Sequence, residues 1–308
     1  MLKTPFHHLA RVEHLPSVPP IVTEALQLLT QADVNAATVA YVIERDQALT
    51  ARLLRMANSP LYGFPRRITT VRLAISLLGN DAVRELLVAA TLYELLHTGP
   101  SSPLEPEPFW RYCLYCAAAA RCLARYLGYR LAGEAFTAGL LHDIGVLLIA
   151  TYFPAEFLAI KRHQQSTAIP YIEAEYAVLG TTHAELGSWL AERWQLPTPL
   201  TAAIAYHHTE EPPATELPPA PLLPSSPLNG IAQPLTALTA LGESLAHSAG
   251  LRQWYATESI SCPLYIPPSL RDYLLARGLI EASGAPTPPL KEEVERVYQS
   301  LSTVMARG

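Results

Sequence analysis

Lysine is scarce in this chain of 308 residues, which has only Lys3, Lys161 and Lys291 and otherwise uses arginine for its positive charges. Charged residues make up 16% of the sequence, and the net charge is −5. No overall basic excess attracts a polyanion, which argues against nonspecific binding of nucleic acid. Half of the residues are hydrophobic, which is enough for a large buried core in one or two domains and excludes a disordered chain.

Membrane and disulfide signals are missing as well. The N-terminus has no charged stretch followed by an apolar segment, and no run reaches the roughly 18 apolar residues of a membrane span. We therefore expect a cytoplasmic protein that does not enter a membrane. Cys113 and Cys116 form a pair, but no second pair follows at zinc-ribbon spacing, so we interpret them as small buried thiols.

The hydrophobic pattern is helical almost throughout, because apolar residues recur three and four positions apart. It predicts an all-α fold. In the first block, Asn35 and Asp46 are placed to cap helices, and Thr69 or Thr70 opens another helix that stops at Gly79 before the next one begins.

Segments rich in proline and serine divide the chain into parts. We predict an N-terminal helical subdomain over residues 1–97, a linker over 98–108, and a second helical bundle over 109–250. Within that bundle, residues 211–234 contain Pro-Pro twice and Asn-Gly, which predicts a long, exposed and mobile loop. Residues 251–308 are expected to form a C-terminal helical extension.

The clearest chemical signal is the dipeptide His142-Asp143, which places two metal-ligand side chains inside an apolar helical run. A metal centre built from helices needs further donors from elsewhere in the chain. Downstream candidates are His183, His207, His208 and Glu243. Of these groups, a bound metal would be held by His142, Asp143, His183 and His207.

A simpler interpretation needs no metal. His142 and Asp143 can form a buried hydrogen-bonded pair, and Glu243 can be a solvated helix residue. His183 can lie at a helix N-terminus, and only one of the two histidines at 207 and 208 needs to face a pocket. The remaining histidines show no matching partners and are expected on the surface: His7, His8, His14, His97, His163 and His247.

Taken together, these motifs resemble the HDOD family, the output-domain relatives of the metal-dependent HD phosphohydrolases. The resemblance covers roughly residues 15–250. It rests on LPSVP at 15–19, LRMANSPLYG at 54–63, FWR at 109–111, GLLHDIG at 139–145 and HAELG at 183–187. It implies a two-lobed helical module with an HD-type helical bundle in the second lobe.

The resemblance extends to the catalytic relatives, including the HD-GYP phosphodiesterases of cyclic di-GMP, but their ligand set is incomplete here. Their first histidine corresponds to Tyr112, and their terminal aspartate corresponds to Glu243. Their Gly-Tyr-Pro signature is replaced by TEEPP at 209–213. A phenol with a pKa of about 10 is a poor ligand at pH 7. Glutamate, one methylene longer than aspartate, would shift a bound metal.

We therefore expect a non-catalytic regulatory protein that transmits a signal by binding another signalling protein. Its vestigial pocket would comprise Tyr112, His142, Asp143, His183, His207, His208 and Glu243. No cofactor is required, although an adventitious Fe, Mn, Zn or Ni ion can occupy such a pocket. The alternative is a metal-dependent phosphohydrolase of a nucleotide or cyclic dinucleotide, which makes a cyclic dinucleotide the second candidate partner.

Arginines of the first block form another candidate site. They outnumber the nearby acids, so a basic face could receive an acidic partner or a phosphate, although a solvated face is the commoner explanation. Tyr62 and Phe64 place aromatic rings on a turn beside Arg66 and Arg67. This turn either contacts a partner or folds back against the first block.

Overall fold

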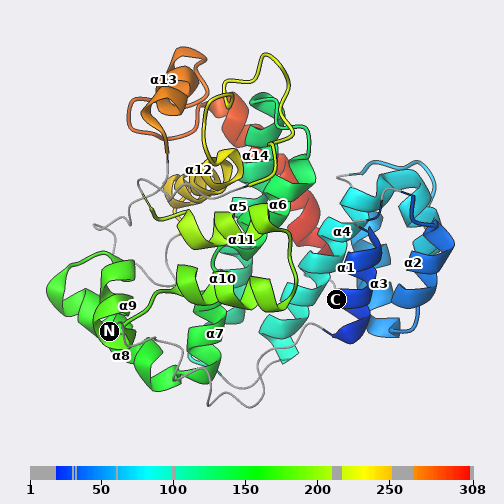
Figure 1. The fold of residues 1–308 in the computed structure, drawn as a ribbon, viewed down its shortest axis with the longest axis horizontal. Coiled ribbons are helices and arrows are strands. Elements are labelled where there is room, and N and C mark those ends of the chain that lie inside the picture. The colour runs from blue at the N-terminus through cyan, green and yellow to red at the C-terminus, as the bar shows by residue number, and fades with distance from the viewer. Residues whose placement is uncertain are drawn as a thin grey trace.

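The computed structural model describes residues 19–29, 31, 33–59, 62–98, 102–209, 217–251 and 266–305. The expected all-α fold is confirmed (Figure 1). The first lobe contains α1 (Pro20–Leu29), α2 (Ala36–Ile43), α3 (Gln47–Ala57) and α4 (Val71–Thr98). The second contains α5 (Pro106–Tyr126), α6 (Ala132–Leu141), α7 (Ile144–Tyr152), α8 (Pro154–Thr167), α9 (Tyr171–Leu179), α10 (His183–Arg193), α11 (Thr198–Tyr206) and α12 (Pro234–Ser248).

Helix starts in the first lobe follow the expected capping residues. The Asn35 carboxamide accepts from the Ala37 N–H at 2.8 Å, and the Asp46 carboxylate accepts from the Leu49 N–H at 3.0 Å. Each bond satisfies a backbone donor that the first helical turn leaves unpaired. The predicted break at Gly79 is also present, as a kink with φ 83° inside α4. A left-handed backbone of this kind favours glycine.

Asn58 fixes the chain where it leaves α3. Its side-chain amide donates to the carbonyls of Leu54 and Ile68 at 2.7 and 2.8 Å, and its carbonyl accepts from the Ile68 N–H at 2.7 Å. The Asn58 side chain therefore joins the last turn of α3 to Ile68, where the segment after α3 ends.

We expect Asn58→Ala to lower the free energy of unfolding by about 1.5 kcal/mol, because the bonded groups of Ile68 lose their partner. Urea denaturation would measure the change. Ser76→Ala, which removes one exposed hydroxyl bond to Arg72, should cost less than about 0.5 kcal/mol. Equal losses of unfolding free energy in the two variants would contradict a stabilising role for the hydrogen bonds of Asn58.

The second lobe is organised around α5, which packs most extensively against α6 and α12. Two glycines allow this close approach. A Cβ atom at Gly139 or Gly242 would lie 2.8 or 2.7 Å from the Cys116 carbonyl oxygen. Both helices therefore cross α5 at the same level, one turn beyond Tyr112. This crossing brings the end of α6 and the middle of α12 to Tyr112.

Two predicted loops need correction. The linker at 98–108 is shorter than expected, because α4 reaches Thr98 and α5 begins at Pro106, where proline suits the first helical turn. Residues 210–216 lie outside the described part of the chain, and Pro234 already belongs to α12.

The described remainder of the proline-rich loop is packed rather than wholly exposed. Tyr129 and Leu222 form a β-bridge, and the Ser226 hydroxyl donates to the Leu127 carbonyl at 2.5 Å. Leu228 is fully buried. Proline and glycine content correctly predicted that residues 217–233 form no helix and no strand, but it did not predict the buried side chain of Leu228.

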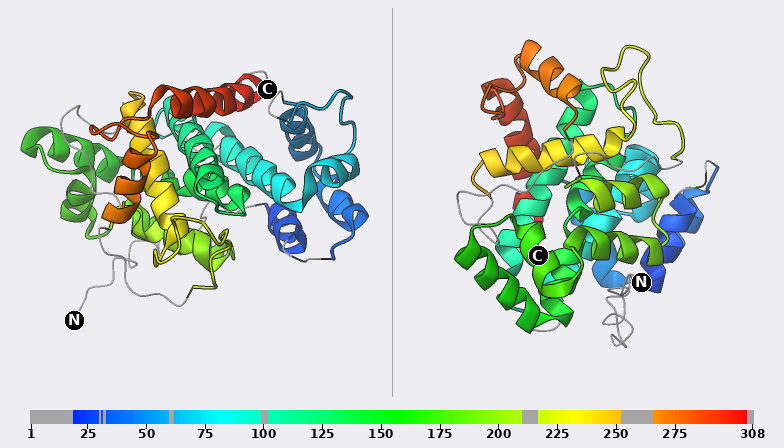
Figure 2. Two further views of the ribbon diagram at one scale, coloured as in Figure 1. Left: turned by 90° about the horizontal axis from the view of Figure 1, so that it is seen from above. Right: turned by 60° about the vertical axis from the view of Figure 1, so that its left-hand side comes forward.

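The C-terminal extension contains α13 (Pro268–Ala276) and α14 (Pro288–Met305). Helix α14 packs along α5 and also contacts α3, so it touches both lobes (Figure 2). Arg111 donates from Nε to the Tyr298 hydroxyl at 3.1 Å. The extension therefore braces the two lobes against each other.

The segment Ala132–Tyr152 is long and apolar enough to cross a membrane by composition. In the fold, 89% of an apolar 18-residue stretch within this segment is buried inside the protein. It is also divided into α6 and α7 by the turn at His142 and Asp143. The apolar character of this segment is accounted for by its place in the core.

A buried ion pair joins the two lobes. Arg121 of α5 donates to Glu85 of α4 at 2.9 Å, and both side chains are less than 10% exposed. A Cβ atom at Gly133 would lie 2.1 Å from a Glu85 oxygen, so α6 also meets the pair. The Tyr62 ring lies 6.0 Å from the Arg121 guanidinium. Tyr62 is therefore half-buried at the lobe junction, and its role as a contact residue stays a prediction.

The junction predicts a pH dependence of stability. Burial raises the pKa of Glu85 from 4.5 to about 7 even though Arg121 opposes the shift. The folded state therefore binds this proton more tightly than the unfolded chain. Its contribution to stability is complete below pH 4.5 and is lost as the pH rises towards 7.

Replacing Glu85 with glutamine isolates the contribution of its carboxyl group to the pH dependence of stability. We expect the wild type to lose more unfolding free energy than Glu85→Gln does between pH 5 and pH 8, as measured by urea denaturation. A difference between the two proteins that is the same at both pH values would contradict the assignment.

Candidate metal centre

Four separate helical elements bring the predicted ligands together. His142 and Asp143 form the turn between α6 and α7, and His183 is the first residue of α10. The other donors come from the end of α11 and the middle of α12. The six side chains are at most 5% exposed: His142, Asp143, His183, His207, His208 and Glu243. The structure therefore places every predicted donor in one closed cluster.

Two histidines are held in a definite tautomer. Nδ1 of His142 lies 2.9 Å from the Gly139 carbonyl oxygen, and Nδ1 of His207 lies 2.8 Å from that of Ile204. A carbonyl oxygen only accepts, so each Nδ1 donates and carries the proton. Neither Nε2 has a hydrogen-bond partner within the described part of the chain. Both nitrogens therefore present a lone pair to the cluster, as a metal ligand must.

Asp143 lies at the centre of the histidines. Its Oδ1 is 3.1 Å from Nε2 of His183 and 3.6 Å from Nε2 of His207, and its Oδ2 is 3.5 Å from Nε2 of His142. Burial alone would raise the pKa of Asp143, but His142 and His183 hold it well below its ordinary value. The carboxylate is therefore ionised and available to a cation.

Glu175 orients His183 from behind. Its carboxylate accepts from Nδ1 of His183 at 2.6 Å and from the backbone N–H of His183 at 3.0 Å. Thr182 and Glu185 complete a capping box that fixes the start of α10. A carboxylate bonded to the far nitrogen of a ligand histidine is a common arrangement around bound metals, and it raises the basicity of the imidazole.

Without a metal, His183 can supply the positive charge itself. Burial opposes protonation, yet Glu175 and Asp143 raise the pKa of His183 well above its ordinary value. His208, 3.1 Å away between the two Nε2 atoms, is instead kept neutral, because burial and His207 lower its pKa to about 3. A metal at this position would therefore have to displace the proton of His183.

Tyr112 occupies the other side of the cluster. Its hydroxyl donates to Glu243 Oε1 at 3.1 Å and lies 3.3 Å from Nε2 of His247. Its ring centroid is 5.6 Å from that of His142. Burial raises the pKa of Glu243, but the histidines around it outweigh burial and lower the pKa to about 2. The phenol that was expected to replace the first histidine ligand of the catalytic relatives thus binds the Glu243 carboxylate.

The donors form two overlapping sets that fit a divalent metal. Each set offers one ligand atom per residue, with all atoms of a set within 4.8 Å of one another: Asp143, His183, His207 and His208, and His142, His207 and Glu243. Imidazole nitrogen and carboxylate oxygen are donors that Zn, Fe, Mn and Ni accept. The first set offers four donors and the second offers three.

Sequence similarity identifies the family. The sequence profile of the HDOD domain matches residues 15–210, which is more than half of the 308-residue chain. The chain belongs to the HDOD family. Glu243 and α12 lie beyond the matched range, so their place in the cluster rests on the structure.

Similar solved structures support the fold. An HDOD domain protein of unknown function from Geobacter sulfurreducens is 27% identical, with a TM-score of 0.68, and the match covers 98% of this chain and 95% of that chain. A Shewanella amazonensis protein, provisionally called a phosphohydrolase, is 24% identical with a TM-score of 0.67 and 97% coverage of both chains. At that identity the likeness shows the fold alone.

An uncharacterised protein of Treponema pallidum (strain Nichols) is 26% identical over 199 residues. The match covers 64% of this chain but only 38% of that protein. This HDOD chain therefore matches less than half of the length of that relative.

The predicted position of His247 is wrong. It was expected on the surface, but it is 8% exposed, with Nε2 3.4 Å from Glu243 Oε1. The signal that could have identified it is the spacing of four residues from Glu243, which places both side chains on one face of α12. The sequence interpretation also missed Glu175, which has no motif of its own.

The other histidines and the cysteines are placed as follows. His207 and His208 both lie in the cluster, although only one needed to face it. His97 is exposed and stacks on Tyr93, His163 is half-buried, and His7, His8 and His14 lie outside the described residues. Cys113 and Cys116 are buried free thiols, and burial raises the pKa of both, as expected for inert side chains.

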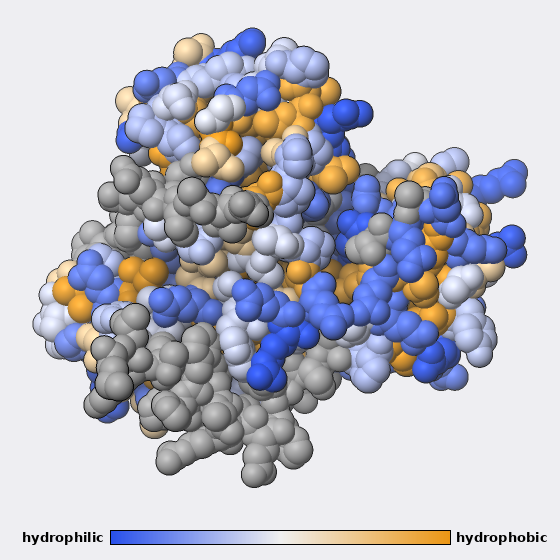
Figure 3. Space-filling model, in the orientation of Figure 1, coloured by the Kyte–Doolittle hydropathy of each residue, from blue (hydrophilic) through white to orange (hydrophobic). Residues whose placement is uncertain are grey.

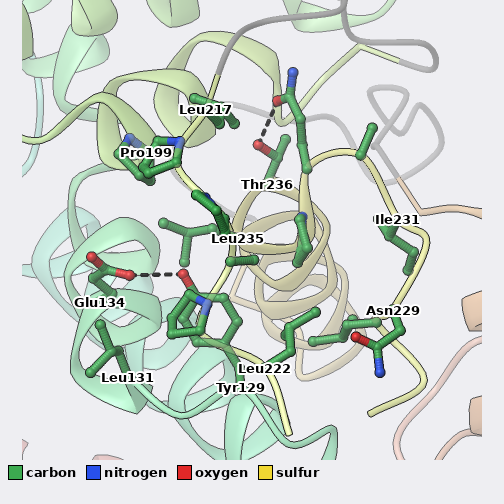
Figure 4. Close-up of a pocket in the computed structure, with 18 of the residues that line it drawn as sticks. Tyr129, Leu131, Glu134, Pro199, Leu217, Leu222, Asn229, Ile231, Leu235 and Thr236 are labelled. Carbon is green, nitrogen blue, oxygen red and sulfur yellow. Dashed lines mark hydrogen bonds between the residues drawn. The ribbon is translucent and has the colours of Figure 1, made fainter. Parts of the chain in front are cut away.

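A separate cavity of about 560 Å³ lies at the N-terminal ends of α6 and α11, whereas the metal cluster lies at their C-terminal ends (Figure 4). Tyr129 donates to Glu134 at 2.8 Å on its wall, and residues 217–222 of the proline-rich loop form another side. No donor of the metal cluster lines this cavity.

Proposed function

We propose that this HDOD protein is a non-catalytic regulatory module that transmits a signal by binding another signalling protein. The main support for this proposal is that the donor cluster is buried, since its six side chains are at most 5% exposed. A hydrolase must admit its substrate to within bonding distance of the metal and its activated water. A phosphodiester cannot reach these donors in the conformation described.

Tyr112 supports the same proposal. A catalytic metal site keeps an open position for water or substrate. Here the phenol hydroxyl and Nε2 of His247 lie against Glu243, on the side where the first histidine ligand of the catalytic relatives would reach. The pocket is thus filled by side chains that bond to one another.

A structural metal is compatible with this function. Asp143, His183, His207 and His208 would hold it, and it would supply a positive charge that locks the ends of α6, α10 and α11 together. The histidines already have the required orientation. Such an ion would act through stability and helix geometry rather than through hydrolysis.

One observation favours the alternative, a metal-dependent phosphohydrolase of a nucleotide or cyclic dinucleotide. The first donor set offers four donors, and its ligand types are those of hydrolytic metal centres. This alternative requires that the cluster open to admit a substrate.

Substrate access separates the two functions. Cyclic di-GMP would be titrated into manganese-loaded wild type and into the double variant His142→Ala, Asp143→Ala by calorimetry. The regulatory proposal predicts the same heats for both proteins. Saturable binding by the wild type that the double variant lacks would support the phosphohydrolase.

A further inference from the structure

An exposed surface with an excess of arginine lies where α4 begins. Residues 47–80 contain five arginines and no aspartate or glutamate. Arg66, Arg67 and Arg72 are exposed and form no ion pair within the described part of the chain. Elsewhere in this lobe, Arg45 pairs with Glu24 and Arg52 with Glu94. Three exposed arginines without an ion pair therefore lie close together in the sequence at the start of α4.

The same segment also exposes apolar side chains. Leu73 and Leu77 are 37% and 46% exposed, and their spacing of four residues puts them on one face of α4. Phe64, in the preceding turn, is 37% exposed. Figure 3 shows hydrophobic and hydrophilic side chains intermingled on the visible face of this lobe. The first half of α4 thus has an outer apolar stripe in addition to its buried face.

The surface is held rigidly. Asn58 bonds Ile68 at one end of the turn, and the Tyr62 ring lies by Arg121 at the other. Val71, Ala74 and Ile75 fix α4 in the core. A partner would therefore meet preformed side chains and spend little free energy on ordering them.

We propose that these residues, the α4 entry surface (Phe64, Arg66, Arg67, Arg72, Leu73 and Leu77), bind an acidic amphipathic helix of a partner protein. This inference deepens the proposed function, on which it rests, by naming the kind of partner. Leu73 and Leu77 pack against the apolar stripe of the partner helix. The three arginines pair with carboxylates that flank the stripe.

Other anionic partners fit this surface less well. A nucleic-acid backbone would make no apolar contact with the exposed pair Leu73 and Leu77. Stable attachment to a membrane by an amphipathic helix needs a wide apolar face, whereas α4 offers two exposed leucines beside residues committed to the core.

The probe is a synthetic helical peptide with leucines at i, i+4 and i+7 flanked by glutamates, followed by fluorescence anisotropy. We expect saturable binding to the wild type. Arg66→Glu with Arg67→Glu, and separately Leu73→Ser with Leu77→Ser, should each weaken it at least tenfold. The matched control is Arg271→Glu with Arg277→Glu, in α13 and at its C-cap, which changes the net charge equally and should weaken binding less than twofold.

Three results would overturn the inference. Equal weakening by the control pair means that only net charge attracts the peptide. Saturable binding of a single-stranded oligonucleotide or of phosphatidylserine vesicles, with none of the peptide, means that the partner class is wrong. No saturable binding of the peptide removes the docking site. Metal-dependent turnover with peptide binding intact would refute the proposed non-catalytic function and leave the docking surface standing.

Discussion

Gly145→Ala is expected to lower the free energy of unfolding by at least about 3 kcal/mol, because the added methyl group meets backbone that cannot rotate away. The new Cβ would lie 1.9 Å from the carbonyl oxygen of His183 and 2.8 Å from the backbone nitrogen of Gly187. Either α7 or α10 must move. Thermal and urea denaturation would measure the loss, and a displaced His183 should also weaken metal binding.

Gly180→Ala is the matched control. Gly180 has φ 69° and open space around its Cβ position, so alanine there should cost only the backbone strain, about 1 kcal/mol. A Gly145→Ala variant no less stable than Gly180→Ala would show that α7 and α10 do not approach each other this closely.

Restoring the ligand types of the catalytic relatives should strengthen metal binding 10- to 100-fold, or about 1.4 to 2.7 kcal/mol. The variant is Tyr112→His with Glu243→Asp. It replaces the hydroxyl that bonds Glu243 with an imidazole beside His142, which adds a fourth donor to the second set. Calorimetric titration of the metal-free protein with Mn²⁺ would measure the affinity.

Tyr112→Phe with Glu243→Asp separates the new ligand from the loss of the hydroxyl. This control removes the hydrogen bond but adds no donor, so its affinity should stay within threefold of the wild type. Equal gains in both variants would contradict a ligating role for position 112.

Local signals account for what the sequence predicted of the fold. Asn35, Asp46 and Gly79 act within one helical turn, and each occurs where capping chemistry or a left-handed backbone requires it. The loop at 217–233 depends instead on long-range contacts. Its burial arises from Leu228 and from the Tyr129–Leu222 bridge, which no local composition encodes.

The candidate site shows the same division. His142, Asp143 and His183 could be predicted because their residue types and order match a family pattern. Glu175 acts through a hydrogen bond to His183, and His247 acts through Tyr112 and Glu243. Residues of this kind are recognised only when the distances between helices are known, because carboxylates and histidines are also common on solvated helix faces.

The claim that this HDOD protein signals without catalysis is tested most directly by turnover. Wild type and the double variant His142→Ala, Asp143→Ala would be assayed on cyclic di-GMP and on a phosphomonoester, with Mn²⁺ or Fe²⁺ added. The account predicts that the wild type hydrolyses both compounds no faster than the double variant. Turnover that either metal stimulates in the wild type alone would contradict it.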